Sequence, residues 1–142
     1  MKNRSRDFSF RIGTTSYIYP GNMLENIERL KGTVEDIELL YFEQGYSVEK
    51  DSIKKLMEIT EEYGLTYTIH LPLDLDFSHT TELVRSKSVD DVLRIFREVS
   101  DLNPESYILH LNRNSNNLIN NCLTDSLNAV VSNMNNPEKT LY

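Results

Sequence analysis

The chain has 142 residues, of which 39% are hydrophobic and 26% charged, as in soluble globular domains rather than disordered chains. The formal net charge of −7 excludes a large basic surface, so we expect neither nucleic acid nor a membrane surface as a partner. A single cysteine, no signal-peptide pattern and no apolar run of roughly 20 residues predict a cytoplasmic protein without an internal disulfide.

The N-terminal part of the chain alternates strand and helix patterns. Residues 8–14 predict a first strand, and a Pro-Gly turn follows it. Asn22 can cap a helix whose apolar residues recur at helical spacing up to a stop at Gly32. The nearly continuous apolar run at 37–42 then predicts a second strand, covered on both faces in a parallel sheet.

The middle of the chain continues this alternation. Ser47 or Asp51 opens a second amphipathic helix that ends at Gly64, and residues 66–71 predict the third strand. An unusually long connection, residues 71–88, precedes the next helix.

The C-terminal part supplies a fourth unit and the beginning of a fifth. Ser88 and Asp91 resemble the N-cap pair of a third helix, which is followed by a strand at 106–111 and a last helix near 115–134. Residues 140–142 predict a fifth strand that stops as it starts.

Four strand–helix units in this order predict an α/β fold with a parallel sheet. A closed barrel of eight such units needs roughly 250 residues, so the chain is expected to be the (βα)4 half of a TIM barrel, with residues 1–142 as one partial domain. The alternative is a complete, four-stranded open sheet.

The strongest candidate for a functional site is a motif that occurs twice, TYTIHL and SYILHL. It places His70 and His110 at the ends of the third and fourth strands, forty residues apart. Neighbouring parallel strands lie about 4.8 Å apart, so both imidazoles can reach one metal ion or one phosphate. The alternative is that each histidine only ends its strand and hydrogen-bonds a loop carbonyl.

A third ligand or a general base is expected beside this pair. Glu43 follows the second strand at the same edge of the sheet and is the best candidate for either role. Glu38 lies within that strand with the opposite side-chain parity, so a structural role is the expectation for it.

Four further residues are candidates for substrate binding. His79 lies in the long connection, which can cover the site. Thr15 and Tyr17 follow the first strand and can hydrogen-bond a polar substrate, and Arg113 can pair with a phosphate. The P-loop, G-x-G-x-x-G, CxxC, HExxH and nucleophile-elbow motifs are absent from the sequence.

The strands ending IHLPL and ILHLNR, with an acidic residue after the second strand, resemble those of the xylose-isomerase-like TIM barrels. That superfamily includes sugar isomerases, epimerases and the endonuclease IV group. The resemblance implies that His70 and His110 are metal ligands, for zinc or manganese. It also implies a further ligand, a Glu on the fifth strand, beyond the end of this sequence.

Within that superfamily, the stretches FRIGTTSYIYPGNMLENI, DIELLYFEQG and IHLPLDLDF resemble the cobamide-remodelling phosphodiesterases called CbiR. The resemblance implies hydrolysis of a phosphoester in the nucleotide loop of cobamides. A sugar or polyol isomerase or epimerase is the second hypothesis. The third is a half barrel without activity, which binds a ligand, a second copy of itself or a complementing C-terminal half.

Overall fold

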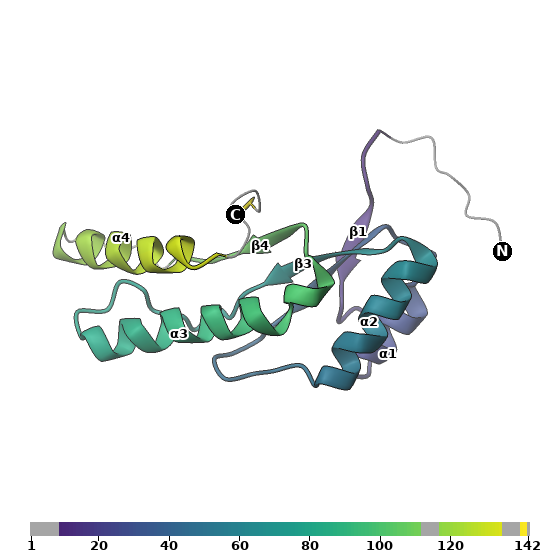
Figure 1. Cartoon of the computed structure of the whole chain (residues 1–142), viewed down its shortest axis with the longest axis horizontal. Coiled ribbons are helices and arrows are strands. Elements are labelled where there is room, and N and C mark those ends of the chain that lie inside the picture. Colours follow the sequence, from purple (N-terminus) through teal and green to yellow (C-terminus); the bar gives the residue numbers. More distant parts are fainter. Residues whose placement is uncertain (1–8, 112–116, 135–139, 142) are drawn as a thin grey trace.

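The structure is a computed structural model that describes residues 9–111, 117–134 and 140–141. Its strands form one parallel sheet in the order β1-β2-β3-β4-β5 (Figure 1). Each strand pairs with the next one along the chain, as expected for successive βα units. The strands are β1 (Gly13–Thr15), β2 (Asp36–Leu40), β3 (Thr66–His70), β4 (Ser106–Ile108) and β5 (Thr140–Leu141); the helices are α1 (Met23–Leu30), α2 (Lys50–Tyr63), α3 (Glu82–Glu98) and α4 (Asn117–Ser132), with a short 3-10 helix (Ser100–Leu102) before β4.

The two faces of the sheet differ in chemistry because side chains alternate along each strand. On the outer face, Ile37, Leu39 and Ile69 are fully buried in the core that the sheet shares with the helices. The residues between them, such as Glu38 and His70, lie on the inner face and are only half-buried. Since the outer face alone packs against helices, any site built on the strands opens on the inner face.

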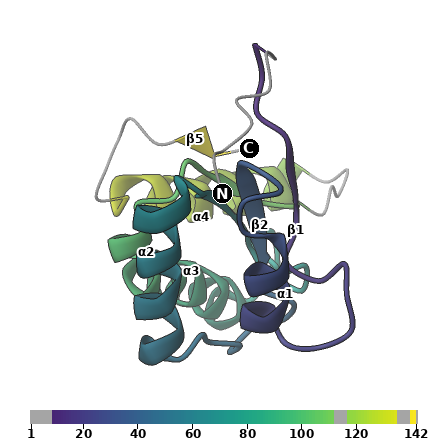
Figure 2. The same cartoon turned by 90° about the vertical axis from the view of Figure 1, so that its right-hand side faces the viewer.

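The helices lie in chain order along the outer face. Helices α1 and α2 lie side by side in both views (Figures 1 and 2), and α3 packs against α4. The apolar core draws on every helix; its helical members are Met23, Ile27, Leu30, Ile53, Leu56, Ile59, Val92, Ile95, Phe96 and Val130. None of the helices in the described part of the chain is long and apolar enough to cross a membrane.

The first two helices begin and end largely where their local signals predict. Asn22 caps α1 by accepting a hydrogen bond from the Glu25 amide, while the Glu25 carboxylate accepts one from the Asn22 amide. Gly64 ends α2 with a φ of +68°, a left-handed conformation that glycine adopts without steric cost. The N-cap of α2 is Glu49, so the expectation of Ser47 or Asp51 is wrong.

The start of α3 is the largest difference from the sequence-based expectation. The helix begins at Glu82 with Thr81 as its N-cap, so the connection after β3 is shorter than predicted. Ser88 and Asp91 lie inside the helix, both buried, and they hydrogen-bond the loops that pack on it. The prediction that they form an N-cap pair is therefore wrong.

Two strand predictions also need correction. β1 begins at Gly13, and residues 9 and 10 lie outside it, whereas a strand over 8–14 was expected. β2 is buried on its outer face only, with the alternation of half-buried and buried residues that a one-sided strand gives. The fifth strand is present as expected, paired in parallel with β4.

Candidate active site

The two histidines of the repeated motif meet at the carboxyl end of the sheet. His70 is the last residue of β3, and His110 lies two residues beyond the end of β4. Their Nε2 atoms are 3.0 Å apart, and the ring centroids are separated by 4.9 Å. The prediction that this pair shares one place in the fold is confirmed; what it binds there is untested.

The tautomer of His70 follows from a second contact. Its Nδ1 lies 3.0 Å from the carbonyl oxygen of Leu71. A carbonyl only accepts hydrogen bonds, so Nδ1 carries the proton and donates it. In the neutral ring, Nε2 then keeps its lone pair, which can accept a hydrogen bond from His110 or bind a metal ion. A backbone carbonyl on the far nitrogen is also the usual arrangement for histidines that bind metal.

The carboxylate in contact with this pair is Glu38. Its Oε1 lies 3.8 Å from His70 Nε2, and its side chain keeps 31% of its surface exposed. The register explains this contact, because Leu40 pairs with His70 and Glu38 shares the face of Leu40. The expectation that Glu38 is structural rested on its parity alone; the structure places it on the inner face with His70.

Glu43 lies in a different environment. It belongs to the β2–α2 loop (residues 41–49), and its side chain is exposed. Among the described residues it makes no side-chain hydrogen bond or ion pair with His70 or His110. Its predicted role as ligand or base has no contact to support it.

The inner face below the histidines is polar. Asp36 accepts hydrogen bonds from the hydroxyl groups of Thr66 and Thr68. Thr15 pairs in register with Glu38, and its hydroxyl oxygen is buried without a hydrogen-bond partner. Buried hydroxyl groups are usually satisfied, so Thr15 is an exception on this face among the described residues, and its oxygen is not exposed to a ligand.

Three aromatic side chains gather beside the same edge, after β1 and β2. The rings of Tyr17 and Phe42 meet edge to face with their centroids 4.5 Å apart. The ring centroid of Tyr46 lies 6.5 Å from that of Phe42. The hydroxyl groups of Tyr17 and Tyr46 are 3.4 Å apart. Burial is the main cause that raises the pKa of Tyr17, so its phenol stays protonated near neutral pH. We call Tyr17, Phe42 and Tyr46 the aromatic cluster.

A charged network on α3 holds the β2–α2 loop, which carries Phe42 and Tyr46 of this cluster. Arg94 donates to the carbonyl of Tyr46 and forms ion pairs with Asp91 and Glu98. Asp91 accepts from the amide of Gly45. Glu98 accepts from the amide of Val48 and from the buried hydroxyl of Tyr41. We call Asp91, Arg94 and Glu98 the α3 network.

The remaining predicted site residues are not brought to the histidine pair. His79 uses Nδ1 to accept a hydrogen bond from the Thr81 amide, two residues on, and thereby orders the turn before α3. Arg113 lies outside the described residues. Phe42 and the α3 network were not anticipated from the sequence, although an exposed phenylalanine directly after a strand is a signal that could have been read.

The donor set fits a metal ion only in part. Two nitrogen ligands of a tetrahedral zinc ion lie ~3.3 Å apart, close to the separation of the two Nε2 atoms. Within the part of the chain that the structure describes, however, no group of three or more His, Cys, Asp or Glu side chains is arranged to hold a metal. His70 and His110 can thus be two ligands of a site that needs more.

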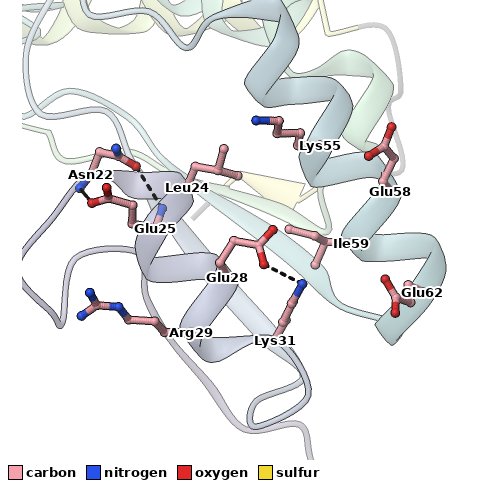
Figure 3. Close-up of a pocket in the computed structure, with 10 residues that line it drawn as sticks. All are labelled: Asn22, Leu24, Glu25, Glu28, Arg29, Lys31, Lys55, Glu58, Ile59 and Glu62. Atoms are coloured by element: carbon pink, nitrogen blue, oxygen red, sulfur yellow. Dashed lines mark hydrogen bonds and ion pairs between the residues drawn. The ribbon is translucent and has the colours of Figure 1, made fainter.

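A cleft of about 600 Å³ lies elsewhere, between α1 and α2 (Figure 3). Its lining mixes both charge signs, and Glu28 and Lys31 already pair with each other on its α1 side. Such a lining selects no ligand charge, and the cleft belongs to the helical layer rather than to the strand ends.

The comparisons with known proteins find similarity in structure only. No protein-family model matches the chain, and no curated protein is similar to it. A D-tagatose 3-epimerase-like protein superposes with a TM-score of 0.75 at 20% identity, over 93% of this chain and 51% of that protein. An L-ribulose 3-epimerase superposes with a TM-score of 0.71 at 20% identity, over 92% of this chain and 48% of that protein. A 3-keto-D-glucoside 4-epimerase from E. coli superposes with a TM-score of 0.69 at 16% identity, over 92% of this chain and 54% of that protein.

These likenesses establish the fold. The chain has the α/β fold of half of a TIM barrel, as the sequence predicted, and it spans about half the length of the structures it matches. At these identities the likeness carries no activity with it.

Proposed function

We propose that this chain belongs to a sugar isomerase or epimerase, in which its inner sheet face contributes one part of the active site. The observation that carries the proposal is the convergence of His70, His110 and Glu38 at the carboxyl end of the strands. Active sites of barrels lie at that end. The three solved structures compared above are epimerases by name, which favours this reading over the cobamide phosphodiesterase that the sequence resemblance implied.

The chemistry of such a reaction is proton transfer next to a carbonyl group. Glu38 removes the proton from the carbon beside the carbonyl and, for isomerisation, delivers it to the neighbouring carbon of the enediolate on the same face. Epimerisation would need a second acid on the opposite face, which would come from the groups that complete the site. Without a metal, Nε2 of His110 is the donor in its contact with His70, and the same N–H can instead donate to a substrate oxygen.

A divalent metal ion, zinc or manganese, is part of the proposal. His70 and His110 would hold it, together with ligands that this chain does not supply among its described residues. When bound, such an ion polarises the substrate carbonyl and makes the neighbouring proton more acidic.

The test is hydrogen exchange at carbon. The chain is incubated in D2O with D-tagatose, L-ribulose or D-fructose and a divalent metal, and proton NMR follows the loss of the signal beside the carbonyl. We expect exchange that Glu38→Gln abolishes and Glu43→Gln leaves intact. Exchange that depends on Glu43 instead would identify Glu43, in the β2–α2 loop, as the general base. No exchange with any of these ketoses would contradict the proposal.

The phosphodiesterase reading has its own assay. Release of a cobinamide phosphate from an adenosylcobamide, measured in the same preparation, would support it. Arg113, which that reading uses as a phosphate ligand, can be tested there as Arg113→Ala.

A second candidate function is favoured by the half-buried inner face of the sheet. We infer that this face docks a complementing set of βα units, which would cover Glu38 and His70 and add the missing groups of the site. A second copy of the chain is less favourable as the occupant, because it would bring two Asp36 and two Glu38 side chains toward each other. Light scattering tests this: a mass of 16.5 kDa alone is expected, and twice that value would point to the homodimer.

A further inference from the structure

We propose that the aromatic cluster is a binding subsite for the C–H face of a closed sugar ring, such as that of a glycoside, next to the His70–His110–Glu38 group. This inference rests on the proposed function for the sugar class of the ligand. It adds which form of sugar binds and which residues select it.

The position follows from strand parity and from the contacts of Tyr41. Tyr41 donates its hydroxyl to Glu98 on the outer, helical side and is 1% exposed. Phe42, the next residue, therefore points to the other side, and half of its surface is exposed. The amide of Tyr41 donates to the carbonyl of His70, so Phe42 follows directly on the residue that pairs with this histidine.

This position sets the distance between the cluster and the reacting groups. Tyr17 follows β1 and Phe42 follows β2, while His70 ends β3, one strand further along. Adjacent strands are about 4.8 Å apart, which is close to the width of a six-membered sugar ring. A ring lying on Phe42 thus places its edge substituents at Glu38 and His70.

The β2–α2 loop, which carries Phe42 and Tyr46, is bonded to α3 at several points. The α3 network bonds three successive parts of it, at Gly45, Tyr46 and Val48. The side chain of Gln44 adds a fourth bond, to the hydroxyl of Ser88. A loop with this many bonds to a helix presents its aromatic rings in one arrangement, so little conformational entropy is lost when a ligand binds.

The chemistry of the surface selects a ring over an open chain. An aromatic face carries partial negative charge and attracts C–H groups, whose hydrogens are slightly positive. A closed sugar ring presents several C–H groups on one flat face, with its hydroxyl groups around the edge. The phenol hydroxyl groups of Tyr17 and Tyr46, whose rings both contact Phe42, can hydrogen-bond those hydroxyls. An open-chain polyol has no such continuous face.

The experiment is an NMR titration of the full chain, observing the aromatic ¹³C–¹H signals. Methyl β-D-glucopyranoside is the ring probe and sorbitol, also with six carbons, is the open-chain probe. We expect the glucoside to shift the signals of Tyr17, Phe42 and Tyr46, and sorbitol to leave them unchanged. Phe42→Leu keeps the apolar volume but removes the ring, and should weaken glucoside binding about fivefold.

Two variants serve as controls for this substitution. Phe42→Tyr keeps the aromatic face and should bind the glucoside as the wild type does. Leu83→Ala removes a side chain that is 78% exposed at the start of α3, and it should have no effect. Circular dichroism of each variant verifies that the fold is intact.

The inference is overturned by equal glucoside affinity in wild type and Phe42→Leu, by equal shifts with both probes, or by no aromatic shift up to the solubility limit of the glucoside. The two assays separate a failure of this subsite from a failure of the proposed function. Glucoside shifts that persist without any carbon exchange leave the subsite standing alone. Exchange that depends on Glu38 while Phe42→Leu binds normally leaves the function without this subsite.

Discussion

The contacts of Glu98 predict the largest loss of stability from a single polar side chain in the α3 network. The carboxylate is 15% exposed and accepts from the Tyr41 hydroxyl at 2.8 Å, from the Val48 amide and from Arg94. In Glu98→Ala, the Tyr41 hydroxyl and the Val48 amide both lose their acceptor. Each buried donor left unsatisfied costs about 1–3 kcal/mol, so we expect a loss of about 3 kcal/mol.

Urea denaturation followed by circular dichroism measures this loss. With a typical slope of about 2 kcal/mol per molar urea, the midpoint should fall by ~1.5 M. Tyr41→Phe should cost less, about 1 kcal/mol, because the carboxylate keeps two other donors. Glu61→Ala, on the exposed face of α2, is the matched control and should stay within about 0.5 kcal/mol of the wild type.

Two results would refute this reasoning. One is a free energy of unfolding for Glu98→Ala within about 0.5 kcal/mol of the wild-type value. The other is full additivity of Glu98→Ala and Tyr41→Phe in the double variant, since two groups that share a hydrogen bond must couple.

Three more predictions follow from other parts of the structure. Burial raises the pKa of Tyr67 to about 12, so the Tyr67 phenol ionises at lower pH in the unfolded chain than in the folded one. The stabilisation from the neutral phenol is complete below pH 10, and the free energy of unfolding falls by about 1.4 kcal/mol per pH unit between pH 10 and 12. Tyr67→Phe should reduce this fall in urea titrations. His70→Ala and His110→Ala should each weaken zinc binding at least tenfold in calorimetry, whereas His79→Ala should not; unchanged stoichiometric metal in the first two would exclude them as ligands. Gly64→Ala should cost about 1 kcal/mol through its φ of +68° alone, because nothing lies within 4 Å of the added methyl, and an unchanged urea midpoint would contradict this.

The features that sequence reasoning predicted correctly depend on residues close together in the chain. The capping of α1 needs only Asn22 and Glu25, three residues apart, and the end of α2 needs only a glycine at the right place. The half-barrel fold could be predicted for the same reason, since each βα unit has its own periodicity. The approach of His110 to His70 then follows from the parallel pairing of β3 with β4, because the register sets His70 beside Ile108 and His110 follows two residues later.

The α3 helix illustrates why other features could not be predicted in this way. Ser88 and Asp91 have the spacing of a capping pair, and nothing local distinguishes a cap from a helix interior that bonds elsewhere. Ser88 is fully buried because Gln44 and Asp76, far away in the sequence, donate to its hydroxyl. The tertiary contact changed the function of residues that local rules assign to a helix start.

The choice between Glu38 and Glu43 depends on the same kind of long-range information. Glu38 and Glu43 have opposite side-chain parity, so at most one of them was expected to face the histidines, and the position of Glu43 directly after the strand favoured Glu43. The structure buries only the face of Ile37 and Leu39, so Glu38 lies on the open inner face, in contact with His70. Parity alone could not reveal this, because it states which residues share a face but not which face carries the helices. Since the helices pack on the face of Ile37 in this fold, the acid within the strand, and not the acid after it, meets the histidines.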